Sequence, residues 1–129
     1  MSKDMKQKEP TGIPVDTIIV GTTRYQIVRD NEALQRRGSM TNEVIDGYCD
    51  TEEGFIVLPG KSLSPLYSGE FSADYMRKLV THELIHAIFR NYGYNVGHSD
   101  VEETICTVME SALVPLLRQN KELIKWLSE

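Results

Sequence analysis

The chain has 129 residues and a mass of 14.7 kDa, which is enough for one domain with a hydrophobic core and too little for two ordinary domains. Apolar residues make up 40% and charged residues 26%, and this composition excludes a chain that is disordered throughout. The net charge of −5 gives no electrostatic sign of binding to nucleic acid or to anionic membranes, so neither is expected as a partner.

The N-terminal residues predict a flexible tail followed by a β-hairpin. Residues 1–12 are polar and rich in lysine, so they cannot pack on a core, and the apolar segment of a secretory signal is missing. A single domain is expected over residues 13–129. The β-branched or aromatic runs 15–20 and 24–29 flank the turn GTT and predict a hairpin. Since no run approaches the ~18 apolar residues of a membrane span, we expect a cytoplasmic protein.

A short helix and a second hairpin are expected next. In the stretch 30–38, Asp30 is the candidate N-cap and Gly38 is the residue expected just beyond the last turn. The runs NEVIDGYCD (42–50) and GFIVLPG (54–60) flank the turn TEEG and predict the second hairpin.

The second half of the chain is predicted to be helical. Ser72 is the candidate N-cap of a helix of about five turns, which Gly93 ends. A second helix follows from Ser99 or Asp100, and Pro115 is expected to kink or end it. A last short helix is expected to pack on the body through Leu123, Ile124, Trp126 and Leu127. Strands followed by helices predict an α+β fold, in which antiparallel β-hairpins form a small sheet against the helices.

The segment LVTHELIHAIFRNYG, residues 79–93, places two histidines four residues apart. Residues i and i+4 of a helix lie about 40° apart around its axis, so His82 and His86 project from one face and can share one metal ion. Glu83 lies about 100° from His82, where it can reach a water bound to that ion and act as a general base. A catalytic zinc ion takes three protein ligands and a water, so a third ligand has to come from elsewhere.

A packing role is the alternative for these three polar residues, because histidines in a helix are often ordinary core residues with satisfied ring nitrogens. The helix is apolar nearly all round from Leu79 to Phe89. Three buried polar groups in such a helix cost free energy unless something satisfies them. A metal ion would satisfy them together, and this favours the metal site.

HELIH is the HExxH signature of zinc peptidases, and residues 72–116 resemble the gluzincins, in particular the small ImmA/IrrE-type metallopeptidases of phages and mobile elements. In that family a second helix reads approximately ExxAxxFAxxLLMP. Here Glu102 is followed by apolar residues and by Pro115 in the same spacing, although Ile105 replaces the usual small residue and SALVP stands where LLMP is typical. The resemblance implies a minimal zincin-like fold, a Zn²⁺ ion and a glutamate ligand at Glu102.

Glu102 is the expected third ligand, and three alternatives stay open. Helical phase groups Glu102 with the apolar residues that are expected to face the core, which are Ile105, Val108, Met109, Ala112 and Leu116. Glu102 could instead cap its own helix, because Ser99 and Glu102 have the spacing of a capping box. The other two candidate ligands are Glu103 and His98.

His98 is also the candidate donor to the oxyanion that forms when water attacks a peptide carbonyl. Tyr75 and Tyr94 are rival donors, and an ordinary surface or packing role is the alternative for each of the three. Cys49 and Cys106 are 57 positions apart and form no CxxC pair, so we expect two free thiols. Cys49 could also reach the metal ion, although a half-buried strand residue is the simpler interpretation.

Together these observations predict a zinc-dependent metallopeptidase that hydrolyses peptide bonds. His82, His86 and Glu102 would bind Zn²⁺, Glu83 would be the general base and His98 the oxyanion donor. The resemblance implies a protein encoded by a phage or a mobile element, which acts in the host cytoplasm on a protein or peptide such as a regulator.

The segment GFIVLP, residues 54–59, is the candidate strand for pairing with an extended substrate. The alternative function is a non-catalytic, zinc-binding interaction protein on the same scaffold, such as a phage factor that targets a host protein. No nucleic-acid or membrane partner is expected, and the sequence does not fix the oligomeric state.

Overall fold

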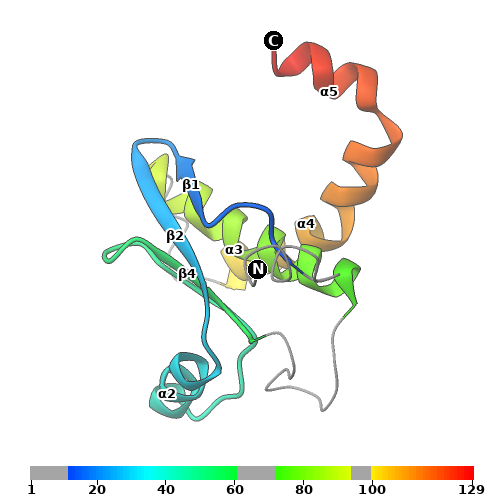
Figure 1. Cartoon of the computed structure of the whole chain (residues 1–129). Coiled ribbons are helices and arrows are strands. Elements are labelled where there is room, and N and C mark those ends of the chain that lie inside the picture. Colours follow the sequence, from blue (N-terminus) through cyan, green and yellow to red (C-terminus); the bar gives the residue numbers. More distant parts are fainter. Residues whose placement is uncertain (1–11, 61–71, 94–99) are drawn as a thin grey trace, which may run out of the picture.

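The structure, a computed structural model, describes residues 12–60, 72–93 and 100–129, and the statements below refer to these residues. The elements, in chain order, are β1 (Thr17–Val20), β2 (Thr23–Arg29), α2 (Asn31–Thr41), β3 (Tyr48–Asp50), β4 (Phe55–Leu58), α3 (Ala73–Asn91), α4 (Asp100–Gln119) and α5 (Lys121–Leu127). The predicted α+β fold is confirmed (Figure 1). The expected tail lies outside the described residues except for Gly12, as do Tyr94, His98 and Ser99.

The two expected hairpins join into one mixed sheet with the strand order β1-β2-β4-β3. Both hairpins are antiparallel, and they meet where β2 runs parallel to β4, with Ile27 beside Ile56. Parallel neighbours need a crossover connection, and α2 lies in the connection that follows β2. The crossover therefore explains why the sheet is mixed although both of its hairpins are antiparallel.

The strand β4 is the centre of the core. Successive side chains of a strand point to opposite faces, so Ile56 and Leu58 enter the cluster that packs on α3. Val57 points the other way and packs against Ala33 and Leu34 of α2. Because β4 is also paired on both sides, the expectation that residues 54–59 bind an extended substrate is wrong. Within the described sheet, the edge strand on this side is β3.

The helix α2 begins as predicted and ends later than predicted. The Asp30 side chain accepts a hydrogen bond from the backbone N–H of Ala33 at 3.0 Å, which is the expected N-cap. The helix passes Gly38 and ends at Asn42, which has the left-handed φ of 58°. Gly38 is instead buried within the helix, where a Cβ atom would collide with the backbone carbonyl of Glu43.

The helix α3 has the ends that the sequence predicts. The Ser72 hydroxyl accepts a hydrogen bond from the backbone N–H of Tyr75 at 3.0 Å, and Gly93 follows the helix with a left-handed φ of 73°. It packs on the sheet through Met76 in its first turn and Ala87 in its C-terminal half. The predicted caps therefore place the HELIH segment in the middle of a regular helix.

The helix α4 forms where the sequence predicts it, whereas α5 does not pack as predicted. α4 continues past Pro115 to Gln119, so Pro115 does not end it. α5 has no buried residue, so the expected packing of its apolar side chains on the body is wrong. The apolar residues of α4 that were expected to face the core include Ile105, Val108 and Leu116, which are 37%, 59% and 51% exposed. In Figure 1 the C-terminal part of α4 and α5 extend away from the sheet. None of the described helices has the length and apolar character of a membrane span.

Candidate metal centre

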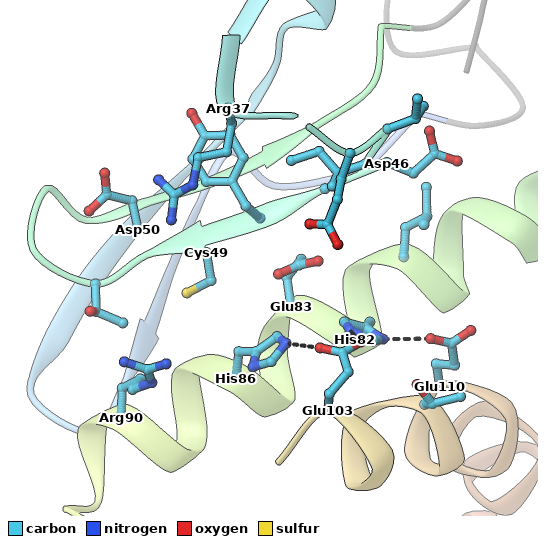
Figure 2. Close-up of a pocket in the computed structure, with 18 of the residues that line it drawn as sticks. Arg37, Asp46, Cys49, Asp50, His82, Glu83, His86, Arg90, Glu103 and Glu110 are labelled. Carbon is cyan, nitrogen blue, oxygen red and sulfur yellow. Dashed lines mark hydrogen bonds and ion pairs between the residues drawn. The ribbon is translucent and has the colours of Figure 1, made fainter. Parts of the chain in front are cut away.

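An open cleft of about 1080 Å³ lies between β3, α3 and the first half of α4. From α3 its wall receives His82, Glu83 and His86, and from α4 it receives Glu103 and Glu110. Figure 2 shows the side chains of the two helices meeting from opposite sides. The HELIH segment therefore lines a cleft and is not enclosed in the core.

Two carboxylates contact the histidines at their Nδ1 atoms and orient the rings. The Nδ1–H group of His82 donates to Glu110 Oε1 at 2.6 Å, and that of His86 donates to Glu102 Oε2 at 2.6 Å. An ionised carboxylate only accepts hydrogen bonds, so these contacts favour the tautomer with the proton on Nδ1, and in that tautomer Nε2 can bind a metal ion. Histidine ligands of metal ions almost always donate their second nitrogen in this way.

The carboxylate of Glu103 faces both of these Nε2 atoms. Glu103 Oε2 lies 2.8 Å from His82 Nε2, and Oε1 lies 3.1 Å from His86 Nε2. Contacts this short between nitrogen and carboxylate oxygen need a proton or a metal ion between them. A single cation on the Nε2 side would satisfy both imidazoles and the carboxylate together.

A thiol lies close to the same histidines. His82, His86 and Cys106 each offer one ligand atom, and these atoms all lie within 4.8 Å of one another, so the group could hold a metal ion. Cys106 comes from α4 and is fully buried. Burial raises the pKa of the Cys106 thiol to about 12, and the nearby carboxylate of Glu103 acts in the same direction.

The donor set fits zinc. Imidazole and thiolate are ligands that zinc prefers, and carboxylate completes many catalytic zinc sites. Magnesium and calcium are usually bound by oxygen ligands alone. His82 and His86, with Glu103 and Cys106 beside them, therefore have the chemistry of a transition-metal site.

Glu83 lies on the sheet side of α3, and Figure 2 shows it between the histidines and the segment that carries Asp46. The residue is 5% exposed, and a Cβ atom on Gly47 would lie 3.1 Å from Glu83 Oε2, so the strand side approaches the carboxylate closely. Burial raises the pKa of Glu83 to about 7, while the charges of His82 and His86 oppose this shift. A cation held by the histidines would favour the ionised carboxylate further.

Opposing effects shift the pKa of His82. Burial lowers it, but the hydrogen bond to Glu110 and the charges of Glu83 and Glu103 together raise it above the usual value. Four carboxylates thus surround the two histidines, and they favour a positive charge at this place, whether it is a proton or a metal ion.

The other predicted site residues have different positions. Tyr75 lines the cleft, and its hydroxyl donates to Asp46 Oδ2 at 2.5 Å. Cys49 lies on β3 at the cleft, is a free thiol like Cys106, and burial raises its pKa to about 12. The proposed oxyanion donors His98 and Tyr94 lie outside the described residues.

Glu102 is close to the site but on the far side of an imidazole. Its Oε2 accepts the hydrogen bond from His86 Nδ1 and lies 3.6 Å from Arg90 Nε. Glu102 is buried, as helical phase predicted, yet the carboxylate that faces the Nε2 atoms is that of Glu103.

The sequence reasoning missed Glu110 and Cys106. Glu110 follows Glu103 by seven residues, or two helical turns, and both line the cleft. Cys106 follows Glu102 by four residues, and these two are the buried residues of α4. The 3.6-residue period could have found both positions once the polar face of α4 was taken to meet α3.

Comparisons of the whole chain with protein families, curated proteins and solved structures found no match.

Proposed function

We propose that the protein is a zinc-dependent peptidase that hydrolyses peptide bonds in the cleft between β3 and α4. The observation that carries the proposal is the convergence of two imidazole Nε2 atoms on one carboxylate, with a buried glutamate next to them. The resemblance of HELIH to the metallopeptidases of phages and mobile elements favours a protein or peptide substrate, such as a regulator, in the cytoplasm of a host.

The proposed ligands are His82, His86 and Glu103. Both oxygens of Glu103 lie on the Nε2 side, at 2.8 and 3.1 Å from the two nitrogens. Glu102 instead contacts Nδ1 of His86, and Glu110 contacts Nδ1 of His82. We therefore assign a positioning role to Glu102, and we assign the role of third ligand to Glu103.

Zinc bound by three protein ligands would act as a Lewis acid and lower the pKa of a water molecule at the fourth position toward roughly 7. Glu83 would take a proton from the attacking water as the water oxygen bonds to the peptide carbonyl carbon. It would then deliver the proton to the amine when the C–N bond breaks. Glu83 is only 5% exposed beside His82 and His86, which would limit the access of bulk water to that proton.

The proposed substrate strand is β3. Its outer edge is unpaired within the described sheet, and residues 48–50 line the cleft. An extended peptide could add to this edge by backbone hydrogen bonds, which would place a peptide bond near the histidines. β3 thus takes the role that the sequence assigned to residues 54–59.

The test combines metal analysis with hydrolysis of a peptide library. We expect one zinc ion per chain and cleavage products with wild-type protein. Glu83→Gln should retain zinc and lose at least about 100-fold in rate, since general base catalysis contributes about 10²–10⁴-fold. The matched control is Glu53→Gln, an exposed glutamate in the turn before β4. Zinc binding without any cleavage would contradict the peptidase, and the absence of zinc would contradict the metal site.

The second candidate is a non-catalytic zinc-binding interaction protein. The observation that favours it is the exposed apolar surface on α4 and α5, which includes Val108, Trp126 and Leu127 at 59%, 67% and 62% exposed. Apolar side chains exposed together on a surface often mark a site that binds another protein. Under this alternative Glu83→Gln would leave zinc content and partner binding unchanged, and no peptide would be cleaved.

A further inference from the structure

The buried thiol of Cys106 is close enough to the histidines to share their metal ion. In a tetrahedral zinc site with Zn–N distances of about 2.0–2.1 Å and a Zn–S distance of about 2.3 Å, ligand atoms lie roughly 3.3–3.6 Å apart. The ligand atoms of Cys106, His82 and His86 already lie within 4.8 Å of one another. A movement of side chains on the order of 1 Å would bring them to bonding distance.

The thiol and Glu103 come from adjacent turns of the same helix. Cys106 follows Glu103 by three residues on α4, and residues three apart are neighbours on a helix surface. Glu103 is on the cleft side, with 57% of its side chain exposed, whereas Cys106 is fully buried between the helices. Glu103 therefore contacts the Nε2 atoms from the open side of the site, and Cys106 approaches the imidazoles from between the helices.

The number of protein ligands decides what a zinc ion can do. With three, a fourth position is open to water and the site can be catalytic, whereas four protein ligands close the coordination and are typical of structural sites. His82, His86, Glu103 and Cys106 would make up four.

We propose that Cys106 is a fourth protein ligand that closes the metal site in part of the resting protein, in exchange with an open form in which wild-type protein cleaves substrate. This inference rests on the proposed function and concerns its regulation. On closure the S–H bond breaks, the sulfur bonds to the ion in place of water, and the proton passes to bulk water. Release is the reverse, in which water takes the position of the sulfur and the thiol regains a proton.

The test uses cobalt(II) in place of zinc, because a thiolate bonded to cobalt gives a charge-transfer absorption that imidazole and carboxylate ligands do not give. The protein for this experiment is Cys49→Ser, in which Cys106 is the only remaining cysteine. We expect the thiolate band to grow in step with cobalt binding and to saturate at one cobalt ion per chain. Bound cobalt without this band would overturn the proposal and leave the metal site and the proposed peptidase standing.

Two further variants separate closure of the site from packing. Cys106→Ser retains the size of the side chain and Cys106→Ala leaves a small apolar one, and both should lack the band and bind zinc at least tenfold more weakly. Both should also cleave peptides faster than wild-type protein, because their zinc site is open. An unchanged zinc affinity in both folded variants would overturn the proposal.

The proposed function and the inference fail in different experiments. Failure of every variant to bind cobalt or zinc would overturn both. A thiolate band in Cys49→Ser, together with no cleavage by either Cys106 variant, would overturn the peptidase and the regulatory role and leave Cys106 as a structural ligand. If neither Cys106 variant folds, the band in Cys49→Ser alone decides whether Cys106 is a ligand.

Discussion

Four glutamates lie around the two histidines, and their surroundings favour different roles in the proposed zinc site. Glu83 is buried beside the histidines and belongs to the strand side of the cleft, which suits a base. Glu102 and Glu110 hold the Nδ1 atoms, and Glu103 faces the Nε2 atoms. The side of the imidazole that a carboxylate contacts therefore decides whether it can bind the ion directly or can only orient a ligand.

The roles of these carboxylates predict a ranking of zinc affinity. Glu102→Gln and Glu110→Gln each weaken the partner of a histidine ligand, and such changes typically lower metal affinity by about 10–100-fold. Glu103→Gln removes a proposed ligand and should lower it further. Competition with a chromophoric chelator measures the affinities, and Glu122→Gln on α5 is the control. A larger loss for Glu102→Gln than for Glu103→Gln would return the third-ligand role to Glu102.

At the scale of elements, α4 shows why the two helices were predicted with different success. Its face toward α3 carries Glu102, Cys106 and Glu110, and its apolar residues Ile105 and Val108 lie mainly on the exposed side. An apolar stripe normally marks the face that meets the core. In this protein the polar groups face α3, where the histidines contact them by short hydrogen bonds. A prediction from the apolar pattern alone therefore assigned the wrong face of α4 to the core.

A glycine within α2 gives a prediction on the fold. Replacement of a helical glycine by alanine usually stabilises a helix by about 1 kcal/mol. Gly38→Ala should instead lower the free energy of unfolding by about 1–3 kcal/mol, because the added Cβ would collide with the backbone carbonyl of Glu43. Urea unfolding measures the change. Gly93→Ala is the comparison. Among the described residues a Cβ there has no atom within 4 Å, so the expected cost comes from its positive φ.

At the scale of the whole molecule, the buried charge of Glu83 links stability to pH. The pKa of Glu83 is about 7 in the folded chain and 4.5 in an unfolded one. Between these values the unfolded chain loses the proton while the folded chain retains it, so stability falls as the pH rises from 4.5 to 7. The raised pKa of His82 gives the same sign, since its contribution is lost as the pH rises through the folded value.

This linkage predicts the behaviour of protein freed of metal by a chelator. Its free energy of unfolding in urea should decrease between pH 4.5 and pH 7, with up to about 3 kcal/mol from Glu83. Glu83→Gln should remove most of this decrease because glutamine does not titrate, and Glu53→Gln should preserve it. An equal slope in wild type and Glu83→Gln would show that Glu83 is not the group responsible.

The sequence by itself determined what depends on residues close together along the chain. The i, i+4 spacing set His82 and His86 on one face of α3, Ser72 and Gly93 marked its ends, and the apolar run beside the turn TEEG marked β4 as a strand. These features follow from the local geometry of a helix or strand, which any tertiary context preserves.

Only the tertiary structure decided how these elements meet. The rotation of α4 about its axis places Glu103 on the Nε2 atoms, Glu102 on Nδ1 and Cys106 within reach of both histidines. The pairing of β2 with β4 leaves β3 at the edge beside the cleft. Both depend on contacts between segments far apart in the chain. Local periodicity specifies which residues share a face, and packing between elements specifies what that face contacts.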